Sequence, residues 1–347
     1  MLPQKQASPQ MPLNSGVNTR ELSLSNTNKH GLSRYIPADI ERDVRVRSKF
    51  GCVFCRSAIY QYEHIIPEFN DATEHSSEHM CLLCGRCHDK VTKGQISKDS
   101  VRRQYEKVQT DANIKRPFDD LVLDSQSLTV VLGSNIFHGA RTLIEIDGDA
   151  VLAIEPPEDG MSFPTISGEF SDENGEELFR IERNVWSGRP DVWDMKVEGK
   201  EIVIRSAPGK VALKLIIEPP NRIVVERLDM RTRSAFLRLR KGSLEVGRVE
   251  ADAEYSVGLE RFECDGADVG VKVDSVGVQE PILKTVRMVG GKGLTLEGTG
   301  ISLGTGTSRM TILGLSIEHA TKRYTKRMVF PLQEDLQGYS EILPPRI

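Results

Sequence analysis

The spacing of hydrophobic residues along the chain changes near residue 125. Before that point, apolar residues recur three or four positions apart in two segments, as on one face of an α-helix. The first segment runs from about Pro37 to Lys49. The second runs to about Gln109 and follows Ser97, a residue type that favours helix N-termini. The pattern therefore predicts two helices in the first third of the chain.

Short apolar or alternating segments follow one another after residue 125, separated by Gly, Asn, Asp and Pro. None shows helical spacing, so the pattern is typical of an all-β sandwich or barrel, predicted here over residues 125–230. Valine and glycine are dense over residues 231–347, which predicts a meander or a short β-solenoid followed by a C-terminal tail. Trp186 and Trp193 are interpreted as core residues and not as a platform on which bases stack, because the residues around them are acidic.

The start of the chain shows neither the helical nor the strand spacing of apolar residues. Residues 1–33 are rich in Ser, Asn, Gln and Pro, which predicts a disordered tail. Residues 34–112 are expected to form one compact domain, and residues 113–124, with Pro117 and few apolar neighbours, a linker. The predicted fold class is α+β, with a small N-terminal domain followed by an all-β region.

The net charge of −4 divides unevenly along the chain. Residues 1–116 hold 18 Lys and Arg against 13 Asp and Glu, a charge of +5, and the remainder holds 28 against 37, a charge of −9. A basic segment suits a polyanionic partner such as DNA, and an acidic one does not. No run approaches the ~18 apolar residues of a membrane span, and no signal peptide is recognisable. We therefore expect a cytoplasmic protein with no membrane association.

Five of the six cysteines lie between residues 52 and 87. Cys52-x2-Cys55 and Cys84-x2-Cys87 are two pairs separated by 28 residues, which is strong spacing for the ligands of a structural zinc ion. Clustered pairs in a chain without an export signal favour metal binding over disulfides. Cys81-x2-Cys84 is an alternative second pair, which would leave the last cysteine free.

The string EHIIP at residues 63–67 lies between the two cysteine pairs, and His88 directly follows the second pair. In this order, the motifs resemble those of the HNH (His-Me finger) endonucleases over about residues 36–110. The ending LLCGRCH matches the usual ending of that family and favours Cys84 and Cys87 as the second pair, with Cys81 as a small buried residue. The resemblance implies a zinc-stapled ββα-metal nuclease domain that hydrolyses phosphodiester bonds with one divalent ion, Mg or Mn.

Four residues are candidates for the chemistry. His64 can take a proton from water, because a neutral imidazole with a pKa near ~6.5 is a base at cellular pH. The resemblance implies that Glu63 and His88 bind the catalytic metal; alternatively, His88 replaces one cysteine at zinc. His79 stands where the family has its central asparagine, and we expect it to orient His64. Asn70 is a less natural candidate for that role.

Basic residues gather on the two predicted helices. Those that share one face of the first helix are Arg42, Arg45 and Lys49. Those expected to act together on the second helix are Lys98, Arg102 and Arg103. A solvated helix face accounts for such stripes equally well, but beside the nuclease-like motif we interpret all six as contacts to the DNA backbone.

The sequence thus favours a metal-dependent HNH endonuclease acting on DNA. Its acidic β region would target, sense or regulate, through a protein partner or a second copy of the chain. From the resemblance, we expect prokaryotic defence against phage as a setting for such a fusion. One alternative is a catalytically decayed zinc module that binds nucleic acid or a protein partner. Another places the main activity in the β region, as carbohydrate or ligand binding. Glu63, His64 and His88 favour the enzyme, because a decayed site has no reason to keep all three.

Overall fold

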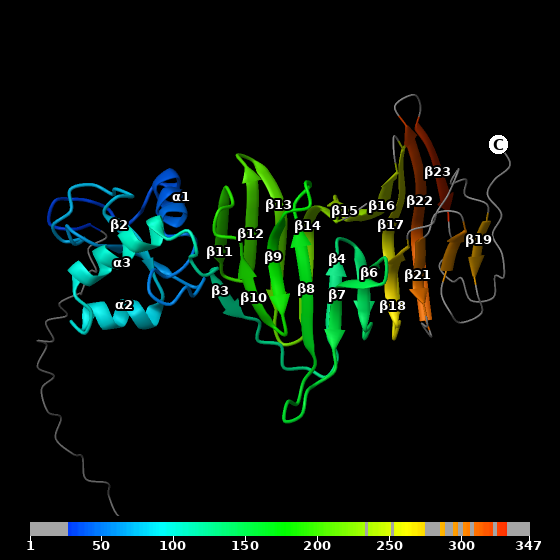
Figure 1. Cartoon of the computed structure of the whole chain (residues 1–347), viewed down its shortest axis with the longest axis horizontal. Coiled ribbons are helices and arrows are strands. Elements are labelled where there is room, and N and C mark those ends of the chain that lie inside the picture. Colours follow the sequence, from blue (N-terminus) through cyan, green and yellow to red (C-terminus); the bar gives the residue numbers. More distant parts are fainter. Residues whose placement is uncertain are drawn as a thin grey trace, which may run out of the picture.

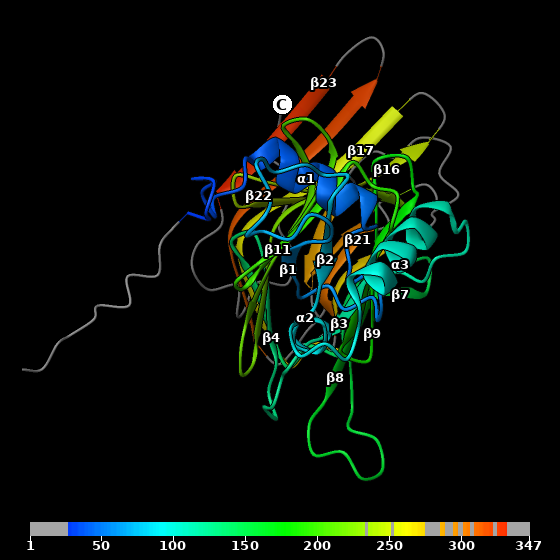
Figure 2. The same ribbon diagram turned by 90° about the vertical axis from the view of Figure 1, so that its left-hand side faces the viewer.

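The computed structural model describes residues 27–232, 235–250, 253–274, 285–288, 294–297, 301–305, 309–321 and 325–331. A small unit with helices lies at one end of an elongated molecule, and two β-sheets extend away from it (Figure 1). Figure 2 views the molecule from the end that carries the helices. Most of the predicted N-terminal tail and residues 332–347 lie outside the described residues. No helix among the described residues has the length and apolar character needed to cross a membrane.

The N-terminal unit is a two-stranded sheet between helices. Its elements are α1 (Ala38–Arg47), β1 (Gln61–His64), β2 (Met80–Leu83), α2 (Gly85–Thr92) and α3 (Lys98–Thr110). The two strands pair antiparallel, with Glu63 opposite Cys81. The Ser97 hydroxyl accepts from the backbone N–H of Ser100 at the start of α3, as the sequence predicts. α1 ends before Lys49, whose φ of 52° is incompatible with a continuing helix.

Strand β2 is buried along its whole length because both faces of the small sheet are covered. Successive side chains of a strand point to opposite faces. Met80 and Leu82 accordingly pack with Val44 of α1. Cys81 and Leu83 pack on the other face with the apolar stripe of α3, which consists of Val101, Tyr105 and Val108. The apolar residues whose helical spacing was recognised in the sequence therefore form the face of α3 that covers the sheet.

The β region consists of two large sheets. In spatial order, the first contains β19 (Thr285–Met288), β20 (Leu294–Glu297), β21 (Ile301–Thr305), β18 (Val269–Val273), β6 (Thr142–Ile146), β7 (Asp149–Glu155), β8 (Thr165–Ser171), β9 (Glu177–Glu182), β10 (Val185–Gly188) and β3 (Phe118–Asp120). The second contains β11 (Asp194–Glu198), β12 (Glu201–Ala207), β13 (Lys210–Glu218), β14 (Arg222–Thr232), β15 (Ala235–Arg240), β16 (Ser243–Glu250), β17 (Ala253–Asp265), β22 (Arg309–Thr321) and β23 (Thr325–Pro331). The hairpin of β4 (Thr129–Leu132) and β5 (Asn135–His138) adds to the second sheet, pairing with β14 and β17.

One hydrophobic cluster contains buried residues from both sheets, among them Phe179 of the first and Leu237 of the second. The sheets therefore pack face to face around one core. The predicted boundary at residue 230 does not separate two bodies: β14 crosses it, and β18 pairs in parallel with β6. Of the described glycines beyond residue 230, Gly242 and Gly266 lie in turns, whereas others, such as Gly258 and Gly270, lie within strands, so the glycine density that predicted a solenoid does not mark turns alone. The pairing of strands more than 100 residues apart has no local signature in the sequence.

The predicted linker also belongs to the fold. Within it, β3 pairs with β10, and the carbonyl of Phe118 accepts from the N–H of Ala58, 2.9 Å away, in the N-terminal unit. Ser57 donates its hydroxyl to Asp119 at 2.9 Å. A three-residue strand is too short to leave a periodic signal, so the sequence alone could not reveal it.

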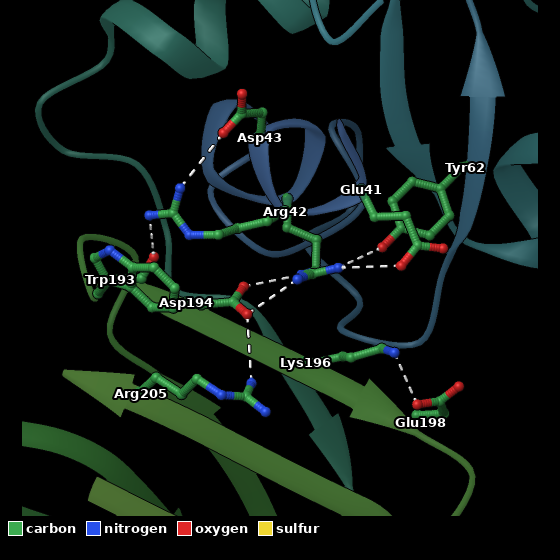
Figure 3. Close-up of polar contacts among 10 residues, drawn as sticks. Glu41, Arg42, Asp43, Tyr62, Trp193, Asp194, Lys196, Glu198 and Arg205 are labelled. Atoms are coloured by element: carbon green, nitrogen blue, oxygen red, sulfur yellow. Dashed lines mark hydrogen bonds and ion pairs between the residues drawn. The ribbon is translucent and has the colours of Figure 1, made fainter. Parts of the chain in front are cut away.

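An ion pair joins α1 to β11, at the edge of the second sheet. The Arg45 guanidinium donates from Nε and Nη2 to the two carboxylate oxygens of Asp194, both at 2.9 Å, and from Nη1 to the Tyr62 hydroxyl at 2.7 Å. The side chains of the ion pair are only 5% and 4% exposed. Nearby, Arg42 stacks on Trp193, with its guanidinium carbon 4.0 Å from the ring centroid, and donates to the Trp193 carbonyl (Figure 3). Both tryptophans were predicted to be core residues. Trp186 is buried in the hydrophobic core, whereas Trp193 is half-buried and covers this junction.

Candidate active site

The four cysteines of the two pairs converge. The sulfur atoms of Cys52, Cys55, Cys84 and Cys87 lie within 4.8 Å of one another. Four thiols meeting at one point form a donor set that can hold a zinc ion. Cys81 is not a member of the cluster: it lies on β2, packed in the core, and burial raises the pKa of its thiol. The geometry thus selects Cys84 with Cys87 as the second pair.

Arg56 holds the first cysteine pair in place, a role that the sequence did not suggest. It follows Cys55 with a φ of 66°, and its side chain is buried. Its guanidinium donates to the carbonyls of Ser48, Gly51 and Cys52 at 3.0, 3.2 and 3.3 Å. Burial lowers the pKa of Arg56 to about 10. The signal available in the sequence was an arginine directly after a CxxC pair, which pattern alone does not distinguish from a surface residue.

A cleft of about 630 Å³ opens beside the small sheet. Glu63 and His64 of β1, His88 of α2 and Lys98 of α3 all line it. Segments before α1 and between the two strands complete its walls, and Asn70 lies in the second of these. The three motif residues singled out as Glu63, His64 and His88 are therefore brought to one cavity.

Glu63 links a histidine and a lysine. Its Oε2 lies 3.0 Å from Nε2 of His88, and its Oε1 bonds the ammonium of Lys98. Lys98 also donates to the carbonyl of His64 at 2.7 Å. His88 faces Glu63 and is not one of the groups in the cysteine cluster. The alternative in which His88 replaces a cysteine has no geometric support.

His64 is 7% exposed, and its imidazole is partnered by another histidine. Its Nε2 lies 3.1 Å from Nδ1 of His75. Burial, followed by the proximity of His75, lowers the pKa of His64 to about 4, which keeps this imidazole neutral at physiological pH.

The structure brings His75 to His64 in the place where the sequence suggested His79. His79 is exposed, and its own hydrogen bonds are made by its backbone, with Ile65 at 2.8 Å and Ser76 at 3.0 Å. The residue that the sequence analysis missed lies in an irregular segment between the strands. The only property of His75 in the sequence that pointed to this role was its residue type, because the spacing of hydrophobic residues does not predict the path of an irregular segment.

The six basic residues do not form one surface. Arg42 and Arg45 are engaged at the junction with the β region, which corrects their interpretation as DNA contacts. Helical spacing predicts which residues share a face but not what covers that face. Lys49 is half-buried beyond the end of α1, and Lys98 points to Glu63. The two exposed members are Arg102, 3.2 Å from Asp99, and Arg103, 3.0 Å from the Ser100 hydroxyl, both on α3.

Comparison with protein-family models, with curated proteins and with solved structures finds no match for this chain.

Proposed function

We propose that this chain is a metal-dependent endonuclease of the HNH type that hydrolyses phosphodiester bonds in DNA. The observation that carries the proposal is the cleft lined by Glu63, His64 and His88 next to the cluster of four cysteines. An acid and two histidines at one cavity provide a metal-binding pair and a base, which are the groups that metal-assisted hydrolysis needs.

His64 is assigned the general base. As a buried, neutral imidazole, it takes a proton from the water that attacks the phosphorus atom. Glu63 and His88, whose carboxylate oxygen and imidazole nitrogen lie 3.0 Å apart at the cleft, would hold the divalent ion, Mg or Mn. The carboxylate is the oxygen donor that a hard cation prefers, and water and phosphate oxygens would complete its ligands. The ion would stabilise negative charge on the phosphate. The ammonium of Lys98 adds positive charge to the same wall.

The remaining parts support this reaction without touching the phosphate that is cleaved. Cys52, Cys55, Cys84 and Cys87 would hold a structural zinc that fixes the segment before β1 against the start of α2. Arg102 and Arg103 offer exposed positive charge for the DNA backbone. The acidic β region is assigned a targeting, sensing or regulatory role through a protein partner or a second copy of the chain.

One observation favours a second candidate, a zinc module that binds nucleic acid or protein without catalysis. Lys98 gives Glu63 a cationic partner from within the chain, so Glu63 is satisfied without a metal. In that case, the ammonium would take the place of the divalent ion, and Glu63 would have a structural role.

Cleavage of supercoiled plasmid by the purified full-length chain in Mg or Mn tests the proposal. We expect nicking that needs the divalent ion and a loss of roughly 10²–10⁴-fold in rate for His64→Ala, the usual contribution of a general base. His138→Ala, a histidine substitution on β5, is the matched control. Metal-dependent cleavage at the parent rate by His64→Ala would overturn the assignment of the base. Absence of cleavage in every variant, with DNA still bound, would support the noncatalytic candidate.

A further inference from the structure

Two imidazoles and a backbone carbonyl form a continuous chain of hydrogen bonds at the cleft. Nε2 of His64 lies 3.1 Å from Nδ1 of His75. The other ring nitrogen of His75, Nε2, lies 2.8 Å from the carbonyl oxygen of Ser33. This chain uses both nitrogens of His75 and one nitrogen of His64.

The carbonyl at the end fixes the position of each proton. A carbonyl oxygen only accepts hydrogen bonds, so Nε2 of His75 carries a proton and donates it to Ser33. In neutral His75, Nδ1 then has a lone pair and accepts. The donor to it is Nε2 of His64, which places the single proton of neutral His64 on Nε2. The lone pair of His64 is consequently on Nδ1.

We infer that His75 is a positioning residue that holds His64 in the tautomer protonated on Nε2, so that Nδ1 is the atom that accepts the proton of water. The inference rests on the proposed function insofar as His64 is the base. It assigns to His75 the orienting role that the sequence suggested for His79. A histidine base in the wrong tautomer has no lone pair where the proton must go, which makes such a partner valuable.

The carbonyl of Ser33 is itself held by a built scaffold. The Asn28 side chain donates to the carbonyls of Phe69 and Ala72 and accepts from the N–H of Leu32 at 2.9 Å. Lys29 pairs with Asp71. The segment that precedes α1 is thereby tied to the segment between the strands, so its predicted disorder up to residue 33 does not extend to the described residues 27–33.

Aromatic packing fixes the two rings as well. The Phe69 ring contacts His64 edge-on, with centroids 5.6 Å apart, and lies nearly parallel to His75 with centroids 6.4 Å apart. Arg34 lies over the Phe69 ring, 4.7 Å from its centroid. The rings therefore have partners for their faces and edges in addition to their nitrogens, which is the geometry that a fixed tautomer needs.

Nitrogen-15 NMR of histidine-labelled, zinc-loaded full-length protein tests the inference without any cleavage assay. Long-range proton–nitrogen couplings report which ring nitrogen of each histidine carries the proton. We expect His64 protonated on Nε2 in the parent chain and in His138→Ala, and a mixture of tautomers in His75→Ala. A parent chain with His64 protonated on Nδ1, or an unchanged spectrum for His64 in folded His75→Ala, would overturn it.

Kinetics give the second readout. His75→Ala should lower kcat roughly 10- to 100-fold, by analogy with metal-bound histidines that lose their orienting partner, with KM little changed. His75→Gln should restore part of the rate, because its side-chain carbonyl can accept from His64 while its amide donates to Ser33. A larger loss for His79→Ala than for His75→Ala would contradict the inference. If the parent chain does not cleave DNA, the proposed function fails, and the NMR result still decides the tautomer.

Discussion

The N-terminal unit and the β region are stabilised in different ways. The β region has one hydrophobic cluster that spans both sheets and contains large buried side chains such as Phe179 and Phe262. The N-terminal unit divides most of its buried apolar residues between two smaller clusters on the faces of a two-stranded sheet, and its Phe50 and Ala58 join the large cluster of the β region. A unit of this size buries too little apolar surface to be stably folded by hydrophobic packing alone, so other contacts must contribute to its folding stability.

These other contacts are polar and specific. The cysteine cluster, the buried guanidinium of Arg56 and the Arg45–Asp194 pair each hold a segment in addition to its apolar packing. The unit with the candidate active site therefore depends on a few strong interactions, whereas the β region depends on many weak ones. Single changes should therefore damage the N-terminal unit much more than the β region.

Removal of zinc should have the largest effect. Binding of a structural zinc contributes roughly 10–16 kcal/mol in small zinc domains, so a strong chelator should unfold the N-terminal unit and leave the β region folded. Limited proteolysis with mass spectrometry should then show new cuts within residues 34–112. Cys52→Ser with Cys84→Ser should behave in the same way.

Cys81→Ala is the matched control, because Cys81 is a cysteine of the same stretch outside the cluster. It should retain one zinc per chain by elemental analysis. Full folding of the chain without zinc, or loss of zinc from Cys81→Ala, would show that the N-terminal unit does not depend on a zinc ion held by the four cysteines.

Loss of the buried ion pair should have the next largest effect. Asp194→Asn removes the bidentate carboxylate partner of the buried Arg45 guanidinium and leaves Glu41, 3.7 Å away, as its acidic neighbour. Removal of one member of a buried pair costs about 3–5 kcal/mol, and we expect Glu41 to offset part of that cost. Although burial alone lowers the pKa of Arg45, its hydrogen bond to Asp194 raises it above the ordinary value, so this arginine stays charged. The helical circular dichroism signal should be lost at a lower urea concentration.

The control for this change lies on the same strand. Lys196 and Glu198 form an exposed pair 2.8 Å apart, also drawn in Figure 3. Glu198→Gln should leave the urea midpoint unchanged, because exposed pairs contribute little. Equal effects of the two substitutions would show that α1 is not stabilised by its contact with β11.

The smallest effect concerns DNA affinity. Arg102→Glu with Arg103→Glu should weaken binding of duplexes of any sequence, because backbone contacts carry no base information. The slope of log affinity against log salt should fall by about 2, one for each phosphate that an arginine no longer neutralises. Lys210→Glu, on β13 of the acidic region, should leave both quantities unchanged. Stronger dependence on Lys210 than on α3 would place the DNA on the β region.

What the sequence predicted correctly was local. The helices appear within two residues of their predicted ends, because their apolar stripes and the cap at Ser97 are encoded in neighbouring positions. Glu63 and His88 meet because a strand and the helix after its partner strand form one compact motif.

What the sequence could not reveal depends on distant residues. Arg45 is buried by Asp194, 149 positions later, and β18 pairs with β6 across more than 100 residues. His75 reaches His64 through an irregular segment whose path is set by side-chain bonds from Asn28. Hydrophobic spacing contains no information on any of these contacts.

The short strand β3 has a mechanical consequence. Phe118 bonds to Ala58 and Arg56 of the N-terminal unit through its backbone, while the same strand pairs with β10. A connection with both edges engaged cannot swivel as a hinge. A force applied to β10 is transmitted through β3 to the cysteine-bearing segment beside the cleft. Insertion of flexible residues at 117 would therefore loosen this connection without altering any residue of the cleft, and the Arg45–Asp194 pair would still join the two parts.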